Sequence, residues 1–140
     1  MMNSTDFGKL GEDIAERYLK KRGWHILARN FRCGSGEIDI LGYRLGILVC
    51  FEVKTRSDDS FGSPASAVNE EKLRKISSAL RVLKTAYSPD GKLPVRYFSL
   101  FTVRRRIFKE RTDIIEVFLT RKRELKGINH IKQKSDKGNW

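Results

Sequence analysis

Two β-prone segments, separated by a short connection bounded by glycines, constrain the fold of this chain most strongly. Residues 37–41 alternate polar and apolar side chains, and residues 47–55 are rich in β-branched and apolar residues. Between them, Gly42 to Gly46 supplies the glycines that a hairpin connection favours. We therefore expect two antiparallel strands joined by a tight turn.

This hairpin would bring two acidic side chains together. Side chains alternate across a strand, so Glu52 and Lys54 share one face of the second segment. If the hairpin is symmetrical about Leu45 and Gly46, Asp39 lies directly opposite Glu52, with the two Cβ atoms roughly 4.5–5.5 Å apart. A turn centred half a residue away would shift this pairing.

Two opposed carboxylates repel each other unless a cation lies between them. A hard cation such as Mg²⁺ prefers oxygen ligands, which Asp39, Glu52 and a main-chain carbonyl near Val53 could supply. Such an ion would neutralise charge on a phosphate and lower the pKa of a bound water, while Lys54 could orient that water. The simpler alternative is that Lys54 pairs with either acid on a solvated face. The apolar run that precedes Glu52 favours the metal site, because unpaired charge is costly beside a buried segment.

The remaining segments complete an α/β pattern. Apolar residues at helical spacing predict a first helix from about Phe7, ending near Gly23, and a second helix from Leu73 to Tyr87. Glu12 falls beside the apolar stripe of the first helix and could reach a site at the sheet edge. We expect further strands at residues 24–31, 95–103 and 113–120 and a loop at 57–67, which gives the order α-β-β-β-α-β-β.

The chain carries a large excess of positive charge. Lys and Arg number 29 against 17 Asp and Glu, so the formal net charge is +12. Such an excess attracts polyanions, and nucleic acid is the leading partner. Most of it lies in residues 104–111 and 121–140, although a charge run can also be a merely solvated surface. The predicted phosphate-contacting residues are Arg104, Arg105, Arg106, Lys109, Arg111, Arg121, Lys122, Arg123 and Lys72.

The length of 140 residues fits one domain, which we place at 1–120, followed by a basic and flexible C-terminal tail at 121–140. No apolar run approaches the length of a membrane span, and no secretory signal opens the chain, so we expect a cytoplasmic protein without a membrane partner. Cys33 and Cys50 have no metal-ligand spacing. We interpret His25 as a strand-edge residue and His130 as part of the tail. Aromatic residues such as Trp24 are expected in the core rather than stacked on bases.

Several motifs together resemble the YraN-like family of small bacterial proteins. The match consists of Gly36-Glu37-Ile38-Asp39-Ile40-Leu41, a 13-residue step from Asp39 to Glu52, and Phe51-Glu52-Val53-Lys54-Thr55-Arg56. It extends to residues 8–15, to Arg29-Asn30-Phe31-Arg32, and to Phe61-Gly62-Ser63-Pro64 with Lys72. The family is similar to archaeal Holliday-junction resolvases, and both have the restriction-endonuclease-like fold with a PD-(D/E)xK motif.

The resemblance implies a mixed central sheet flanked by helices and cleavage of DNA with Mg²⁺ or Mn²⁺. It implies Asp39 and Glu52 as metal ligands, Lys54 as the catalytic lysine and Glu12 as an auxiliary acid, with Glu37 supporting the ligands. The chain departs from the family where Arg96-Tyr97-Phe98 replaces a common Arg-Phe-Asp, so one acid is absent.

We therefore expect a metal-dependent endonuclease that acts on DNA, with branched or junction DNA as a candidate substrate. A homodimer would suit a two-fold symmetric junction. The main alternative is a nucleic-acid-binding module of the same fold with weak or no catalysis. A third interpretation is an RNA- or ribosome-associated protein that uses the basic tail.

Overall fold

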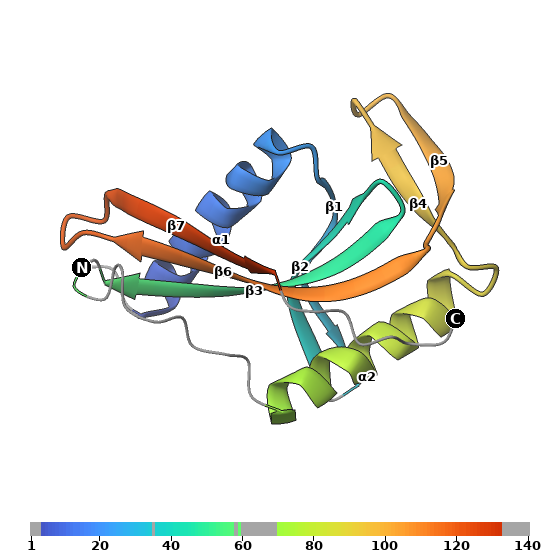
Figure 1. Cartoon of the computed structure of the whole chain (residues 1–140), viewed down its shortest axis with the longest axis horizontal. Helices are drawn as coiled ribbons and strands as arrows, with labels where there is room; N and C mark the ends of the chain where they lie inside the picture. The colour runs from blue at the N-terminus through green and yellow to red at the C-terminus, as the bar shows by residue number, and fades with distance from the viewer. Residues whose placement is uncertain (1–3, 35, 58, 60–69, 133–140) are drawn as a thin grey trace.

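A computed structural model of the chain describes residues 4–34, 36–57, 59 and 70–132 (Figure 1). The predicted Phe61-Gly62-Ser63-Pro64 motif and most of the predicted loop lie outside these residues. The elements are α1 (Ser4–Lys21), β1 (His25–Cys33), β2 (Gly36–Arg44), β3 (Ile47–Ser57), α2 (Glu70–Tyr87), β4 (Lys92–Tyr97), β5 (Phe101–Arg106), β6 (Lys109–Leu119) and β7 (Leu125–Lys132).

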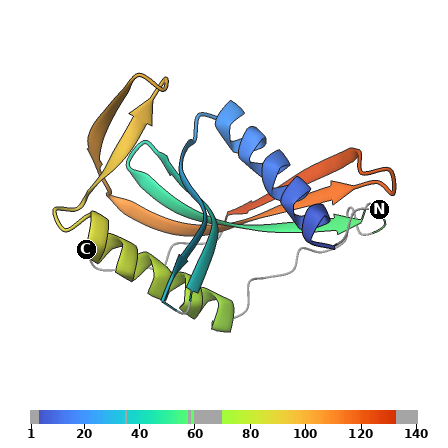
Figure 2. The same cartoon turned by 180° about the vertical axis from the view of Figure 1, so that it is seen from behind.

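Five strands form one mixed sheet in the order β1-β2-β3-β6-β7. The central pair, β3 and β6, is parallel, and the other neighbours are antiparallel. Helix α1 packs on one face of this sheet and α2 on the other, as the two opposite views show (Figures 1 and 2). The predicted mixed central sheet flanked by helices is confirmed, and the elements follow the predicted order.

The core consists of two apolar clusters, one on each face of the sheet. On the α1 face, Leu19 of the helix packs with Val49 and Phe51 of β3. On the α2 face, Leu80 packs in a cluster with Leu48 and Cys50. Since consecutive β3 residues alternate between the clusters, this strand is buried on both faces. Such burial explains its continuous apolar sequence and contributes about 1.5–3 kcal/mol for each large side chain.

The predicted strand at residues 95–103 is instead a hairpin. Strand β4 ends at Tyr97, β5 begins at Phe101, and the two form a separate two-stranded sheet. Phe98 and Ser99 turn the chain with positive φ angles of 51° and 57°, and the Leu100 amide donates to the Tyr97 carbonyl. Glycine or asparagine usually marks such a turn. Because this turn has neither residue, the sequence predicted one continuous strand instead.

Strand β7 occupies part of the segment that the sequence placed in the basic tail. It pairs antiparallel with β6 from Asp113↔Lys132 to Leu119↔Leu125. The segment is polar, but an edge strand needs only a backbone partner and an occasional apolar contact, which Ile128 provides against the α1-face cluster. His130 therefore lies in the sheet, and its interpretation as a tail residue was wrong.

Neither helix is long and apolar enough to cross a membrane.

Candidate metal and nuclease site

The hairpin of β2 and β3 has the register that places Asp39 against Glu52. Leu45 and Gly46 form the turn with φ angles of 48° and 82°, and the ladder runs from Arg44↔Ile47 to Ile40↔Phe51. The next facing positions are Asp39 and Glu52. At this point the ladder ends, and the Asp39 side chain takes the place of a backbone partner, because its Oδ2 accepts a hydrogen bond from Val53 N at 2.9 Å.

The two carboxylates perturb each other. Burial, followed by the charge of Glu52, raises the pKa of Asp39 from 3.8 to about 6, against the opposing effects of the Val53 amide and Lys72. Glu52 Oε2 is buried and has no hydrogen-bond partner among the described residues. A buried carboxylate oxygen without a donor is costly and therefore indicates a missing cationic or protonated partner.

A lysine from α2 supplies part of this compensation. Lys72 Nζ lies 3.2 Å from Glu52 Oε1, and this attraction outweighs burial in raising the pKa of Lys72. The sequence had assigned Lys72 to phosphate contacts, not to this site. Lys54 is half-buried on β3 and forms no ion pair with the part of the chain that the structure describes. The alternative in which Lys54 forms an ion pair with Glu52 or Asp39 is therefore absent from the described residues.

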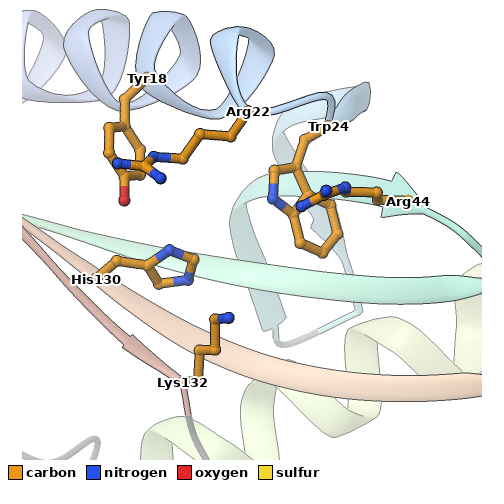
Figure 3. Close-up of a pocket in the computed structure, with 6 residues that line it drawn as sticks. All are labelled: Tyr18, Arg22, Trp24, Arg44, His130 and Lys132. Carbon is orange, nitrogen blue, oxygen red and sulfur yellow. The ribbon is translucent and has the colours of Figure 1, made fainter.

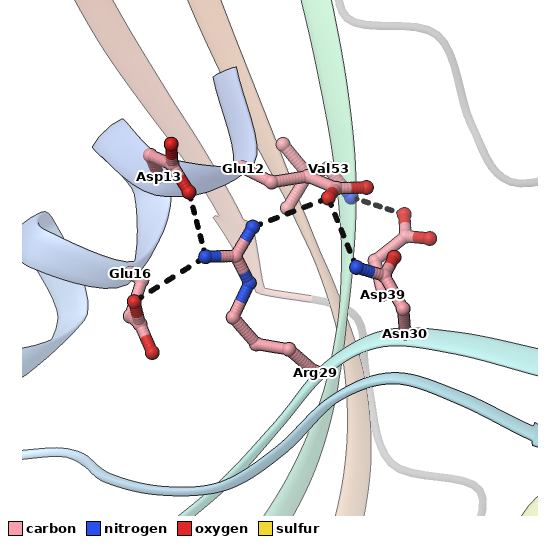
Figure 4. Close-up of polar contacts among 7 residues, drawn as sticks. All are labelled: Glu12, Asp13, Glu16, Arg29, Asn30, Asp39 and Val53. Carbon is pink, nitrogen blue, oxygen red and sulfur yellow. Dashed lines mark hydrogen bonds and ion pairs between the residues drawn. The ribbon is translucent and has the colours of Figure 1, made fainter. Parts of the chain in front are cut away.

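Helix α1 brings Glu12 to the same end of β3. Gly11 lies so close to β3 that a Cβ atom there would overlap the Thr55 side chain, which lets the helix approach the strand. Glu12 Oε2 accepts hydrogen bonds from Arg29 Nη2 and Asn30 Nδ2, both at 3.3 Å (Figure 4). The predicted auxiliary acid is thus near the sheet edge, already bound to two donors.

Arg29 organises this part of α1, a role that the sequence did not suggest. Its guanidinium also binds Asp13 at 2.7 Å and Glu16 at 3.4 Å. Burial opposes its charge, but the hydrogen bonds to Asp13 and Glu12 outweigh burial and raise the pKa of Arg29. The closely spaced acids Glu12, Asp13 and Glu16 were the sequence feature from which a basic partner could have been predicted.

The remaining predicted residues lie farther from the two acids or on the surface. Glu37 is paired across the strands with Arg32 at 3.7 Å. Arg104 is exposed and binds Asp90, and Arg105 Nε donates to the Tyr97 hydroxyl. The exposed side chains also include Arg106, Lys109, Arg121 and Lys122, while the Arg123 guanidinium lies over the Phe7 ring.

Arg111 differs from these surface residues. It forms two hydrogen bonds, at 2.6 and 2.9 Å, with Asp113, a fully buried acid of β6. His130 Nε2 lies 2.7 Å from the same carboxylate. Burial alone would raise the pKa of Asp113, but its hydrogen bonds with His130 and Arg111 hold it below the ordinary value. An acid opening an apolar run at residue 113 was the only sequence signal for this cluster.

A divalent cation fits the Asp39–Glu52 pair in charge and in ligand type. A hard cation that binds oxygen would give the Glu52 oxygen a partner. It would also stabilise the ionised form of Asp39, which burial and Glu52 disfavour. Within the described ranges, no three His, Cys, Asp or Glu side chains are grouped closely enough to bind a metal ion. A divalent cation would therefore have two carboxylate ligands here, with main-chain oxygen and water as its remaining ligands.

Comparison with known proteins agrees with the sequence motifs. A family model described as "Uncharacterised protein family UPF0102" matches residues 11–117. A UPF0102 protein of Clostridium kluyveri is 37% identical over 132 residues, covering 92% of this chain and 93% of the relative. One from Carboxydothermus hydrogenoformans is 44% identical over 81 residues, covering 58% of this chain and 69% of the relative. The chain belongs to the UPF0102 family, the YraN family that its motifs resemble.

Proposed function

We propose that this protein is a metal-dependent endonuclease that hydrolyses phosphodiester bonds in DNA, with branched or junction DNA as a candidate substrate. The observation that carries the proposal is the Asp39–Glu52 pair, in which one buried carboxylate oxygen has no hydrogen-bond partner among the described residues and the neighbouring acid has a raised pKa. A hard divalent cation between the two acids would supply that partner.

Asp39 and Glu52 would hold Mg²⁺ or Mn²⁺ together with the main-chain carbonyl of Val53. The bound ion would neutralise developing charge on the phosphate and make hydroxide available from water near neutral pH. Lys54 shares the strand face of Glu52, and its ammonium has no carboxylate partner among the described residues. It can therefore hold the attacking water or donate to a phosphate oxygen.

The positions of Glu12 and Lys72 give each a separate role. Arg29 and Asn30 hold the Glu12 carboxylate in place, so it is positioned to accept a hydrogen bond from water without moving. Lys72 neutralises Glu52 in the metal-free protein and lowers the cost of keeping two acids together. The exposed arginines of β5 and the residues 121–123 would contact phosphates away from the cut and add affinity without sequence choice.

A second candidate function is a nucleic-acid-binding module of the same fold. Lys72 already compensates Glu52, and Phe98 stands where the family commonly has an acid. These two observations favour a site in which chemistry is weak. A homodimer is compatible with both candidates, and sedimentation of the purified chain with and without a four-way junction would detect it.

Cleavage and binding assays separate the two candidates. Supercoiled plasmid and a four-way junction are incubated with the protein in Mg²⁺ or Mn²⁺, with chelator as a control. Asp39→Asn, Glu52→Gln and Lys54→Gln should abolish cutting while retaining binding, whereas Glu71→Gln, an exposed change on α2, should have no effect. Binding without cutting by every protein, including the wild type, would leave the binding module as the function.

A further inference from the structure

Two adjoining hollows lie on the α1 face, away from the Asp39–Glu52 pair. The first has a volume of about 500 Å³ and is lined by Tyr18, Arg22, Trp24, Arg44, His130 and Lys132 (Figure 3). The second, of about 630 Å³, lies between the α1–β1 connection, the β2–β3 turn and the β4–β5 hairpin, and includes Tyr97 and Arg105. Arg44 lines both, so we treat them as one groove, called the α1-face groove.

The charges of this groove have one sign. Arg22, Arg44, Arg105 and Lys132 line it, and none of the described lining residues is Asp or Glu. These cations come from four different segments of the chain, so the fold, and not a local charge run, gathers them. Like charges placed together without counter-charges are unfavourable. Their convergence therefore favours an anionic ligand.

Aromatic rings accompany the cations along the groove. The Arg22 guanidinium lies 4.4 Å from the centroid of the Tyr18 ring, and the Arg105 guanidinium lies 5.4 Å from that of Tyr97. Figure 3 shows Trp24 beside Arg44 at the wall of the first hollow, but its indole is only 7% exposed and packs on Phe51, so Tyr18 and Tyr97 are the rings open to a ligand. Alternating rings and cations are the side chains that bind single strands, where bases stack and phosphates meet positive charge.

The floor of the first hollow is rigidly built. His130 is nearly buried and is held at 2.7 Å by Asp113, which Arg111 also binds. His130 further contacts the edges of the Tyr18 and Phe51 rings, at centroid distances of 6.0 and 5.8 Å. The imidazole held in this way fixes the floor of the hollow beneath Arg22, Arg44 and Lys132, the three cations that would meet a phosphate group.

We propose that the α1-face groove binds a single-stranded segment of nucleic acid. The inference rests on the proposed function, since it assigns a second contact surface to the nucleic-acid substrate, away from the cut. Arg22 follows Glu12 by ten residues on or just past α1, a separation of about 15 Å along the helix. A strand held in the groove would therefore lie toward the opposite end of α1 from Glu12, and a substrate with an unpaired segment would be preferred over plain duplex.

Binding is measured by the fluorescence anisotropy of a labelled oligothymidylate, which should rise on titration with the protein. The chain has two tryptophans, so Trp140→Phe leaves Trp24 as the only one, and its emission reports changes beside Arg44 although the ring is only 7% exposed. Blunt duplex of equal length should compete less well than single strand. No rise in anisotropy, or stronger competition by duplex, would overturn the assignment.

Charge variants test the residues themselves. In the Trp140→Phe chain, Arg22→Gln with Arg44→Gln should weaken single-strand binding at least tenfold and reduce the slope of log K against log salt by about 1.4, at roughly 0.7 per phosphate contact. Arg74→Gln with Arg81→Gln removes the same charge from the exposed side of α2 and should change affinity little. Equal losses in the two pairs would show that only net charge matters, and the groove would be refuted.

Failure of this inference is distinguishable from failure of the nuclease proposal. Asp39→Asn changes the candidate metal site and leaves the groove intact, so it should bind the oligothymidylate as the wild type does. A protein that binds the oligothymidylate normally but never cuts would retain the groove and lose the nuclease function. A protein that cuts but does not bind the oligothymidylate would retain the nuclease function and lose the groove.

Discussion

Asp39→Asn should stabilise the metal-free protein at neutral pH while removing its response to divalent metal. In the wild type the folded state holds the Asp39 proton more tightly than the unfolded chain, because burial and Glu52 raise the pKa from 3.8 to about 6. Folding therefore loses stability as pH rises between these two values, and the loss is complete above them. Asparagine carries no charge, and its side-chain oxygen can still accept the Val53 amide.

The magnitude follows from the two pKa values. The difference between 3.8 and about 6 corresponds to about 3 kcal/mol of unfolding free energy at pH 7.5. The same linkage leaves about half of this at pH 5 and less than about 1 kcal/mol at pH 4. The gain of the variant over the wild type should shrink in this way as the solution becomes more acidic.

Urea unfolding of both proteins in chelator, at pH 7.5, 5 and 4, measures this gain directly. Mg²⁺ titration then provides the second readout. A ligand present at 100 times its dissociation constant stabilises a protein by about 2.7 kcal/mol, which the wild type should show and the variant should not. A variant that is less stable than the wild type by the same amount at every pH would refute the reasoning, because it would mean that Asp39 acts through packing and hydrogen bonding alone.

Three further changes test the fold around the sites. Asp113→Ala leaves Arg111 and His130 without the buried carboxylate that they share and should lower the unfolding free energy by about 3–5 kcal/mol in urea melts. A loss under 1 kcal/mol would mean that the cluster is solvated. Gly36→Ala places a Cβ within 2.1 Å of a main-chain oxygen of α2 and should displace that helix, reducing the melting temperature; an unchanged melting curve would contradict this packing. Phe98 adopts a left-handed turn conformation and is 85% exposed, so Phe98→Asn should remove backbone strain and raise the free energy of unfolding by about 1 kcal/mol in the same melts. A loss of stability would mean that a partner covers the Phe98 ring in solution.

The hairpin and its acids could be predicted from the sequence because the determinants are local. Alternation across a strand and a two-residue turn fix which side chains face each other, and the observed ladder has the predicted symmetry about Leu45 and Gly46. Helical periodicity likewise predicted both helices. The β4–β5 hairpin escaped prediction because Phe98 and Ser99 adopt positive φ without the residues that usually signal such a turn.

What the sequence by itself determined was therefore the order of elements, the facing of Asp39 and Glu52, and an excess of positive charge. Tertiary structure alone decided that Lys72 meets Glu52, that Arg29 holds Glu12, and that His130 and Asp113 share a hydrogen bond. The physical reason is range. Periodicity and turn chemistry act over a few neighbouring residues, whereas these pairs join positions 17 to 20 residues apart through the packing of helices and an edge strand onto the sheet.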